Sequence, residues 1–186
     1  MRREGKTGDG MLQKTERKSN IDERYEFRAI RPEETEEAGD LEEICFPPHE
    51  ACSRQMMRER ICAAPEMFLV AIDRESGRMA GFLSGLSTDE NAFRDAFFSD
   101  PSLYDPHGKN VMLLGLNVHP EYRLQGLGRE LIRRYARRSL QNGRERLILT
   151  CLDEKVAMYS KMGFRDLGES ASSWGGEKWH EMELRL

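Results

Sequence analysis

The sequence predicts an α/β (α+β) fold, in which strands and helices share one domain, and three observations lead to this class. Short apolar runs bounded by turn residues, such as 68–72 and 111–119, are typical of strands. Longer segments with apolar residues at helical spacing separate them, most clearly at 126–141. The length of 186 residues, with 38% apolar and 33% charged residues, suits a single globular domain with a polar surface.

The N-terminal region divides at about residue 24. Residues 1–24 contain almost no apolar side chains and are expected to form a disordered tail, because burial cannot offset the entropy of ordering them. Residues 25–186 are expected to form the single domain. Within it, Tyr25–Ile30 alternates apolar and polar residues as a half-buried strand does.

Two helices and a hairpin are predicted next. Pro32 opens a helix whose first turns are rich in glutamate, which suits the positive end of the helix dipole, and whose apolar side is expected to contain Leu41, Ile44 and Cys45. The Phe-Pro-Pro sequence at 46–48 ends it, and 53–64 resumes helical spacing. Two apolar runs, 68–72 and 79–86, are separated by Asp, Glu, Ser and Gly and predict a strand hairpin.

The segment 87–110 has no continuous strand pattern. It contains Phe93, Phe97, Phe98 and Tyr104 among acids and prolines. Two interpretations stay open: a functional insertion or lid, and a helix that only packs on the core.

The C-terminal half is predicted to alternate strands and helices. Residues 111–119 form a strand in which Gly115 indicates a bulge or a close approach to the backbone. The helix 126–141 ends at Gly143. A strand at 147–152, a helix at about 155–162 and two strands near 164–167 and 179–184 complete the chain.

Composition excludes several classes of function. The four cysteines and four histidines have neither metal-site nor disulfide-scaffold spacing, so we expect no metal. A net charge of -4 and a pI of about 5.7 give no field that would hold nucleic acid. No apolar run is long enough for a membrane span or a secretory signal. We therefore expect a cytoplasmic protein, monomer or homodimer, whose partner is a small or cationic molecule.

The most informative segment, Val118–Arg129, reads Val-His-Pro-Glu-Tyr-Arg-Leu-Gln-Gly-Leu-Gly-Arg. It places a strand, a tight turn and a helix start in succession, and free amides at a helix start attract phosphate while glycines let it approach. Arg129 and Glu130 follow the last glycine where a nucleotide P-loop needs Lys and Ser or Thr. The three glycines of a dinucleotide fingerprint are also absent. On its own the motif is weak, and the alternative is a helix start that uses glycine for packing.

At these residues the sequence resembles the GNAT superfamily of N-acyltransferases. The strand 115–120 and the turn 123–128 are similar to the family's acyl-CoA motif, and the resemblance spans most of residues 25–186. The segment 151–164, which ends in Tyr-x-x-x-Gly-Phe, matches a second family motif. Residues 46–53 and 181–184 are similar to the serotonin (arylalkylamine) N-acetyltransferase branch.

The resemblance implies a GNAT fold, a mixed, mostly antiparallel bent sheet of about seven strands with about four flanking helices. It implies acetyl-CoA as co-substrate, with pantetheine pairing with the backbone of the strand and the pyrophosphate held by the turn. The cofactor-binding residues implied are Leu116, Asn117, Val118, Arg123, Leu124, Gln125, Gly126, Leu127, Gly128 and Arg129. An amide of Leu116 or Val118 would stabilise the oxyanion.

The resemblance also implies that Tyr159 is the catalytic acid. A phenol, with a reference pKa of about 10, is protonated at neutral pH and can donate to the departing thiolate. The alternative is that Tyr159 is a core aromatic at helical spacing from Val156. Phe46, Pro47 and Glu50 are the expected substrate-binding residues, although the stretch 46–53 is as well explained as a simple turn between two helices.

The sequence departs from the branch at the bulged strand. Where animal enzymes carry two histidines as a proton relay, this chain has Met112 and Leu114. The proton acceptor therefore stays open among Glu50, His49 and a water chain, while His119 and His180 are expected to be structural.

The predicted function is transfer of an acetyl group from acetyl-CoA to the primary amine of a small molecule, by direct attack in a ternary complex. Two alternatives remain from the sequence. One is a non-catalytic acyl-CoA-binding or sensor module, suggested by the missing histidines. The other is the same chemistry on a protein or peptide amine, which requires an open acceptor groove.

Overall fold

A computed structural model describes residues 20–186. Residues 1–19 of the predicted N-terminal tail lie outside this range. Its last five residues do not continue a tail, because Asn20–Arg24 form a short helix, α1. None of the helices between residues 20 and 186 has both the length and the apolar character needed to cross a membrane.

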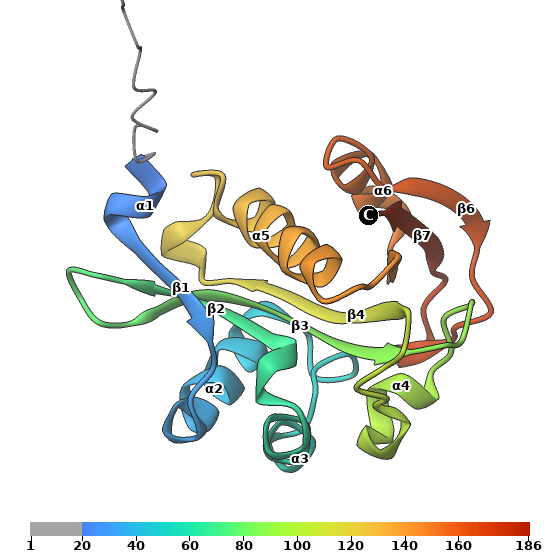
Figure 1. Cartoon of the computed structure of the whole chain (residues 1–186), viewed down its shortest axis with the longest axis horizontal. Helices are drawn as coiled ribbons and strands as arrows, with labels where there is room; N and C mark the ends of the chain where they lie inside the picture. The colour runs from blue at the N-terminus through green and yellow to red at the C-terminus, as the bar shows by residue number, and fades with distance from the viewer. Residues whose placement is uncertain (1–19) are drawn as a thin grey trace, which may run out of the picture.

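The core of the fold is a seven-stranded mixed sheet with helices on both faces (Figure 1). The strand order is β1-β2-β3-β4-β5-β7-β6, and every neighbouring pair is antiparallel except β4 and β5, which are parallel. This confirms the expected class and sheet. The strands are β1 (Tyr25–Ala29), β2 (Phe68–Asp73), β3 (Met79–Thr88), β4 (Asn110–Val118), β5 (Arg146–Cys151), β6 (Arg165–Glu169) and β7 (His180–Arg185).

The four longest of the six α-helices within residues 20–186 flank the sheet, two on each face (Figure 1). On one face lie α2 (Thr35–Cys45) and α3 (Arg54–Ala63). Ser53 caps the start of α3, because its side chain accepts the Met56 amide. On the other lie α5 (Leu127–Gln141) and α6 (Asp153–Ser160). Helix α4 (Ala96–Ser99) is a single short turn within the long connection between β3 and β4. The two faces bury separate apolar clusters because the sheet lies between them.

The predicted apolar sides of the helices are correct except at their margins. On α5, Leu127, Leu131 and Ile132 are buried, whereas Leu140 is exposed. On α2, Leu41 is buried, but Ile44 is 51% exposed, so the prediction was wrong for this residue. Sequence periodicity fixes the centre of a helix face but not its edges, where the neighbouring elements decide burial.

The connection 89–109 packs on the sheet through part of its length. Phe93 and Phe97 are buried against Met112 and Ile148, so these two aromatic residues follow the packing interpretation. Phe98 also packs on this cluster, with its ring centroid 5.1 Å from that of Phe93, and in addition it lines the site described next.

Candidate active site

A cleft opens where the parallel strands β4 and β5 separate. They pair only from Asn110 to Met112 on β4, although both strands continue. Beyond Met112 the β5-facing edge of β4 is therefore free to pair with an extended ligand. Residues on both sides of this gap line the cleft: Leu113, Leu114, Gly115 and Leu116 from β4, and Leu149 and Thr150 from β5.

A bulge on β4 lies at the centre of the cleft. On β3, Ser84 pairs with Gly115 while its neighbour Gly85 pairs with Leu113, so Leu114 has no partner in the ladder. This confirms the predicted irregularity and places the unpaired residue next to Gly115. A bulge re-aims backbone groups at the point where the strand borders the cleft.

The turn after β4 contains two residues in the left-handed region. Leu124 has a φ of 58° and Gly126 a φ of 83°, and Leu124 is the only non-glycine residue with positive φ in the described chain. Alternation of left-handed with ordinary residues points successive amides to one side. Within residues 20–186, the amides of 124–129 have no acceptor, and the Leu124 side chain is fully exposed. Strain at an exposed leucine is typical of a functional backbone.

The remaining predicted cofactor residues have distinct surroundings. Gly128 lies against the side chains of Leu116 and Val118, which face α5, and Leu127 is buried, so only its amide is available. Arg123 is tied back to the strand, because its Nε donates to the Val118 carbonyl at 2.9 Å.

The side chains of three further predicted cofactor-binding residues lie in different places. Gln125 accepts a hydrogen bond from Arg24 of α1 at 2.5 Å, and Arg129 is exposed on the first turn of α5. Asn117 is fully buried on the opposite face of β4, so only its backbone could meet a cofactor.

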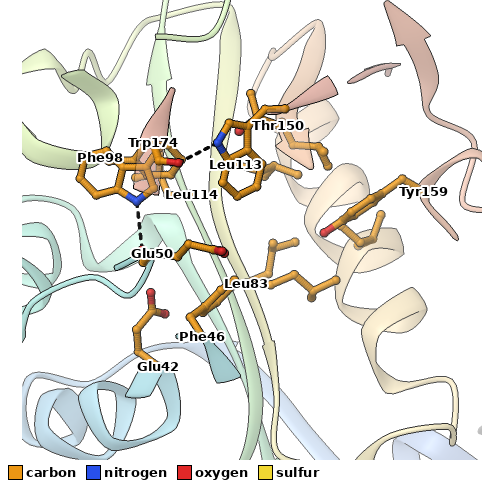
Figure 2. Close-up of a pocket in the computed structure, with 15 residues that line it drawn as sticks. Glu42, Phe46, Glu50, Leu83, Phe98, Leu113, Leu114, Thr150, Tyr159 and Trp174 are labelled. Atoms are coloured by element: carbon orange, nitrogen blue, oxygen red, sulfur yellow. Dashed lines mark hydrogen bonds between the residues drawn. The ribbon is translucent and has the colours of Figure 1, made fainter. Parts of the chain in front are cut away.

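Tyr159 reaches the cleft from α6, on the α5 and α6 face of the sheet (Figure 2). Its ring packs edge-on against Phe164, with ring centroids 5.7 Å apart. Burial raises the pKa of Tyr159, and nearby Cys151 adds to the shift. The hydroxyl therefore stays protonated well above neutral pH and can donate a hydrogen bond.

The opposite side of the cleft lies across the sheet, beside α2. Phe46 and Glu50 line the cleft, and the Glu50 carboxylate points toward the side from which Tyr159 enters (Figure 2). Pro47 has a different place: its carbonyl accepts the amides of Glu50 and Ala51, so it shapes the turn that carries Glu50.

Trp174 covers this side of the cleft and was not singled out from the sequence. Its indole N–H donates to the Glu50 carbonyl at 3.0 Å, and its ring stacks on Phe98 with centroids 4.8 Å apart (Figure 2). Its own carbonyl accepts the indole N–H of Trp179 at 2.9 Å. Asp95, in the connection that carries Phe98, accepts the Ser173 amide at 3.1 Å and so joins this connection to the loop that carries Trp174. An aromatic residue in a Ser- and Gly-rich loop was the only sequence signal.

Glu42 is the second carboxylate of the cleft, and the sequence reasoning also missed it. It lies on α2, lines the cleft and is only 5% exposed. Burial raises the pKa of Glu42, and the Cys52 amide, Arg60 and Asn117 oppose this shift without reversing it. No sequence pattern distinguishes it from the exposed glutamates beside it.

Met112 and Leu114 provide no titratable group at the bulge. Met112 is fully buried in the core, and Leu114 borders the cleft with an apolar side chain. His119 accepts the Glu121 amide at the start of a short turn, and His180 pairs with Asp166 at 3.1 Å. Both histidines therefore have structural partners.

At the mouth of the cleft, His49 lies 3.5 Å from a Glu50 oxygen and 3.7 Å from a Glu177 oxygen. Within residues 20–186 these three side chains are the only cluster with metal-ligating groups close together. His49 and Glu177 are exposed to solvent. The cluster links the 46–53 turn to the loop that carries Trp174.

Comparison with known proteins gives a family match over most of the chain. The model of the acetyltransferase (GNAT) family matches residues 31–164. Serotonin N-acetyltransferase of Mesocricetus auratus is 28% identical over 165 residues, which cover 87% of this chain and 77% of that protein. Thialysine N-epsilon-acetyltransferase of Sus scrofa is 37% identical over 80 residues, covering 41% of this chain and 44% of that protein.

Solved structures share the fold. The loading GNATL domain of CurA from Lyngbya majuscula has a TM-score of 0.75 at 15% identity, covering 87% of this chain and 97% of that domain. A phosphinothricin acetyltransferase from Sinorhizobium meliloti, solved in complex with acetyl-CoA, has a TM-score of 0.63 at 16% identity and covers 88% and 89%.

Proposed function

The chain belongs to the acetyltransferase (GNAT) family, and we propose that it transfers the acetyl group of acetyl-CoA directly to the primary amine of a small molecule. Acyl-CoA-dependent N-acetyl transfer, with acetyl-CoA as co-substrate, is the activity of the family and of its curated relatives. The proposal adds the class of acceptor, the ternary mechanism and the residues.

One observation carries the proposal: a single cleft receives side chains from both faces of the sheet. Tyr159 and Ile132 enter from the α5 and α6 face, and Phe46, Glu42 and Glu50 from the α2 face (Figure 2). A donor bound along the free edge of β4 and an acceptor bound beside α2 would therefore meet at the bulge. Two substrates that meet in one cleft need no intermediate carrier on the protein.

The cysteines support direct attack. All four lie within the described residues, and none lines the cleft. Burial raises the pKa of Cys52 and of Cys151 to about 11 each, so both remain thiols at neutral pH. A thiol is a weak nucleophile compared with a thiolate, and an acyl-cysteine intermediate has no support.

The residues divide the work along the cleft. Amides of 124–129 would hold the diphosphate of acetyl-CoA. The free edge of β4 would pair with pantetheine, and an amide of Leu116 or Val118 would donate to the developing oxyanion. Tyr159 would donate its proton to the departing sulfur.

A small acceptor is favoured by the cover over the α2 side. Phe98 and Trp174 come from segments far apart in the chain, and their stacked rings narrow the access that a polypeptide would need. Aromatic walls with two carboxylates suit an apolar amine that carries a positive charge. The curated relatives are named for serotonin and for thialysine, both small amines.

The experiment that tests this function is release of free CoA thiol from acetyl-CoA across a panel of arylalkylamines, polyamines, amino acids and peptides. We expect steady turnover with at least one small amine and less with peptides. If acetyl-CoA raises the melting temperature but no amine gives thiol, the non-catalytic acyl-CoA-binding function, which the apolar Met112 and Leu114 favour, replaces the proposal. Turnover with peptides alone would refute the small-molecule acceptor.

A further inference from the structure

We propose that Glu42 is the group that takes the proton from the substrate ammonium and so creates the attacking amine. This inference rests on the proposed function and supplies the proton acceptor that the apolar bulge lacks. An alkylammonium resembles lysine, whose reference pKa is about 10.4, so at neutral pH nearly all of it must lose a proton before it can attack.

The placement of Glu42 is the first argument. One of its carboxylate oxygens, Oε1, accepts the Cys52 amide at 3.0 Å. The other, Oε2, lies 3.7 Å from the position that a Cβ atom on Gly115 would occupy. Gly115 adjoins the bulge of β4, where the cleft crosses the sheet. One oxygen is therefore anchored by the Cys52 amide, and the other lies beside Gly115, which lines the cleft.

The surroundings of Glu42 are the second argument, because they suit a base rather than a structural ion pair. No salt bridge joins Glu42 to a cation within residues 20–186; Arg60 of α3 influences it only at longer range. The neighbouring polar group is the fully buried side chain of Asn117 on β4, which favours the ionised carboxylate but carries no charge to pair with it. A buried carboxylate without a paired cation is costly and is typical of functional sites.

Burial of Glu42 has a chemical consequence. It raises the carboxyl pKa, and a base is most effective when its pKa approaches the working pH. The titratable groups that interact with it electrostatically are Arg60 from α3 and the thiols of Cys45 and Cys52. An arriving ammonium would draw the carboxylate toward its ionised form through the opposite charge.

Glu50 has the other role in this arrangement. Its carboxylate lies 3.5 Å from His49 at the mouth of the cleft and points inward along the entry (Figure 2). We assign it to binding the ammonium as it enters. Glu50 is therefore a binding residue, while Glu42 lies next to the reacting centre.

The proton balance of the step is as follows. The ammonium gives one proton to Glu42, and the freed nitrogen lone pair forms the N–C bond to the thioester carbonyl. The C–S bond breaks, and the sulfur receives the Tyr159 proton. After the attack the nitrogen carries two protons; one is lost and restores Tyr159 through solvent, and the other stays on the amide product. Glu42 returns its proton to water. One proton is released for each acetyl group transferred.

The test uses Glu42→Gln, which keeps an oxygen that can accept the Cys52 amide but removes the base. Glu43→Gln is the matched control, because it is the neighbouring glutamate on α2 and is exposed, pairing with Arg54 at 2.7 Å. Initial rates of thiol release are measured from pH 6 to 10, with acetyl-CoA affinity measured by calorimetry for each protein.

We expect Glu42→Gln to lose about 10²- to 10⁴-fold in kcat at pH 7, with unchanged acetyl-CoA affinity. Its rate should then rise about tenfold per pH unit, because only solvent deprotonates the amine, while the wild type levels off earlier. Glu43→Gln should match the wild type. A Glu42→Gln variant with wild-type rate and pH profile would overturn the assignment while the proposed function stands. A wild type that releases no thiol with any amine would instead overturn the function, and this inference with it.

Discussion

Replacing Tyr159 with phenylalanine removes a single hydroxyl from the cleft and leaves the ring that packs on Phe164, 5.7 Å away. Because burial raises the pKa of Tyr159, the hydroxyl is a proton donor throughout the pH range of the assay. A hydrogen bond to a charged group contributes about 1.5–3 kcal/mol. At about 1.36 kcal/mol per tenfold change in rate, its loss corresponds to roughly 10- to 150-fold in kcat, and more if full proton transfer is lost as well.

The assay is steady-state thiol release with a saturating amine, combined with calorimetry for CoA. We expect kcat to fall by about two orders of magnitude while the dissociation constant for CoA and the melting temperature stay near those of the wild type. Tyr135→Phe is the control, because its buried hydroxyl donates to the Met67 carbonyl at 3.0 Å, away from the cleft. It should cost about 0.5–1.5 kcal/mol of stability and leave kcat unchanged. A kcat for Tyr159→Phe within a factor of about three of the wild type would refute the reasoning, because the loss of a hydrogen bond to a charged group lowers a rate by more than that factor.

Three further outcomes are expected. At Gly126 a methyl group has room, with only Ile21 at 4.0 Å, but the backbone φ of 83° disfavours alanine. Gly126→Ala should therefore lose about 1–2 kcal/mol of stability and bind CoA more weakly in calorimetry. An unchanged affinity for CoA would contradict the assignment of this loop. Trp174→Ala should raise the KM for the amine, by removing the stack on Phe98 and the bond to Glu50, but not the KM for acetyl-CoA; equal rises in both would indicate general damage. Because the folded-state pKa of Glu42 is raised above 4.5, the contribution of this carboxyl group to stability is present below that pH and is lost as pH rises through the folded pKa. Glu42→Gln should therefore have a higher melting temperature than the wild type at pH 8 but not at pH 4.5. A lower melting temperature at both pH values would show that the carboxylate stabilises the fold.

The strands and the main helices were predictable because their signals are local. The alternation at 25–30 and the apolar runs at 68–72 and 79–86 correspond to β1, β2 and β3. The helix at 126–141 corresponds to α5, and Gly143 with a φ of 74° follows its end as expected. In each case the residues that decide the element lie within a few positions of one another, so no distant contact is needed to read them.

The turn proposed to bind the cofactor was also readable from sequence, because it is one continuous segment. Two glycines between a strand and a helix specify a turn whose amides are free, and the structure has that turn with Gly126 in the left-handed region. The α2 side of the cleft was read only in part. Phe46 and Glu50 line the cleft, whereas Pro47 shapes the turn behind them.

The sequence by itself determined the strand and helix segments, the phosphate-type turn and the position of Tyr159 on a helix after β5. Only the tertiary structure decided that Glu42, and not the adjacent Glu43, is buried at the cleft, and that Trp174 covers Glu50 from more than a hundred residues away. The reason is physical: periodicity records which face of an element is apolar, but the burial and pKa of a charged side chain depend on segments that only folding brings beside it. The α2 side of this cleft consists of such segments, drawn from α2, the connection after β3 and the loop before β7.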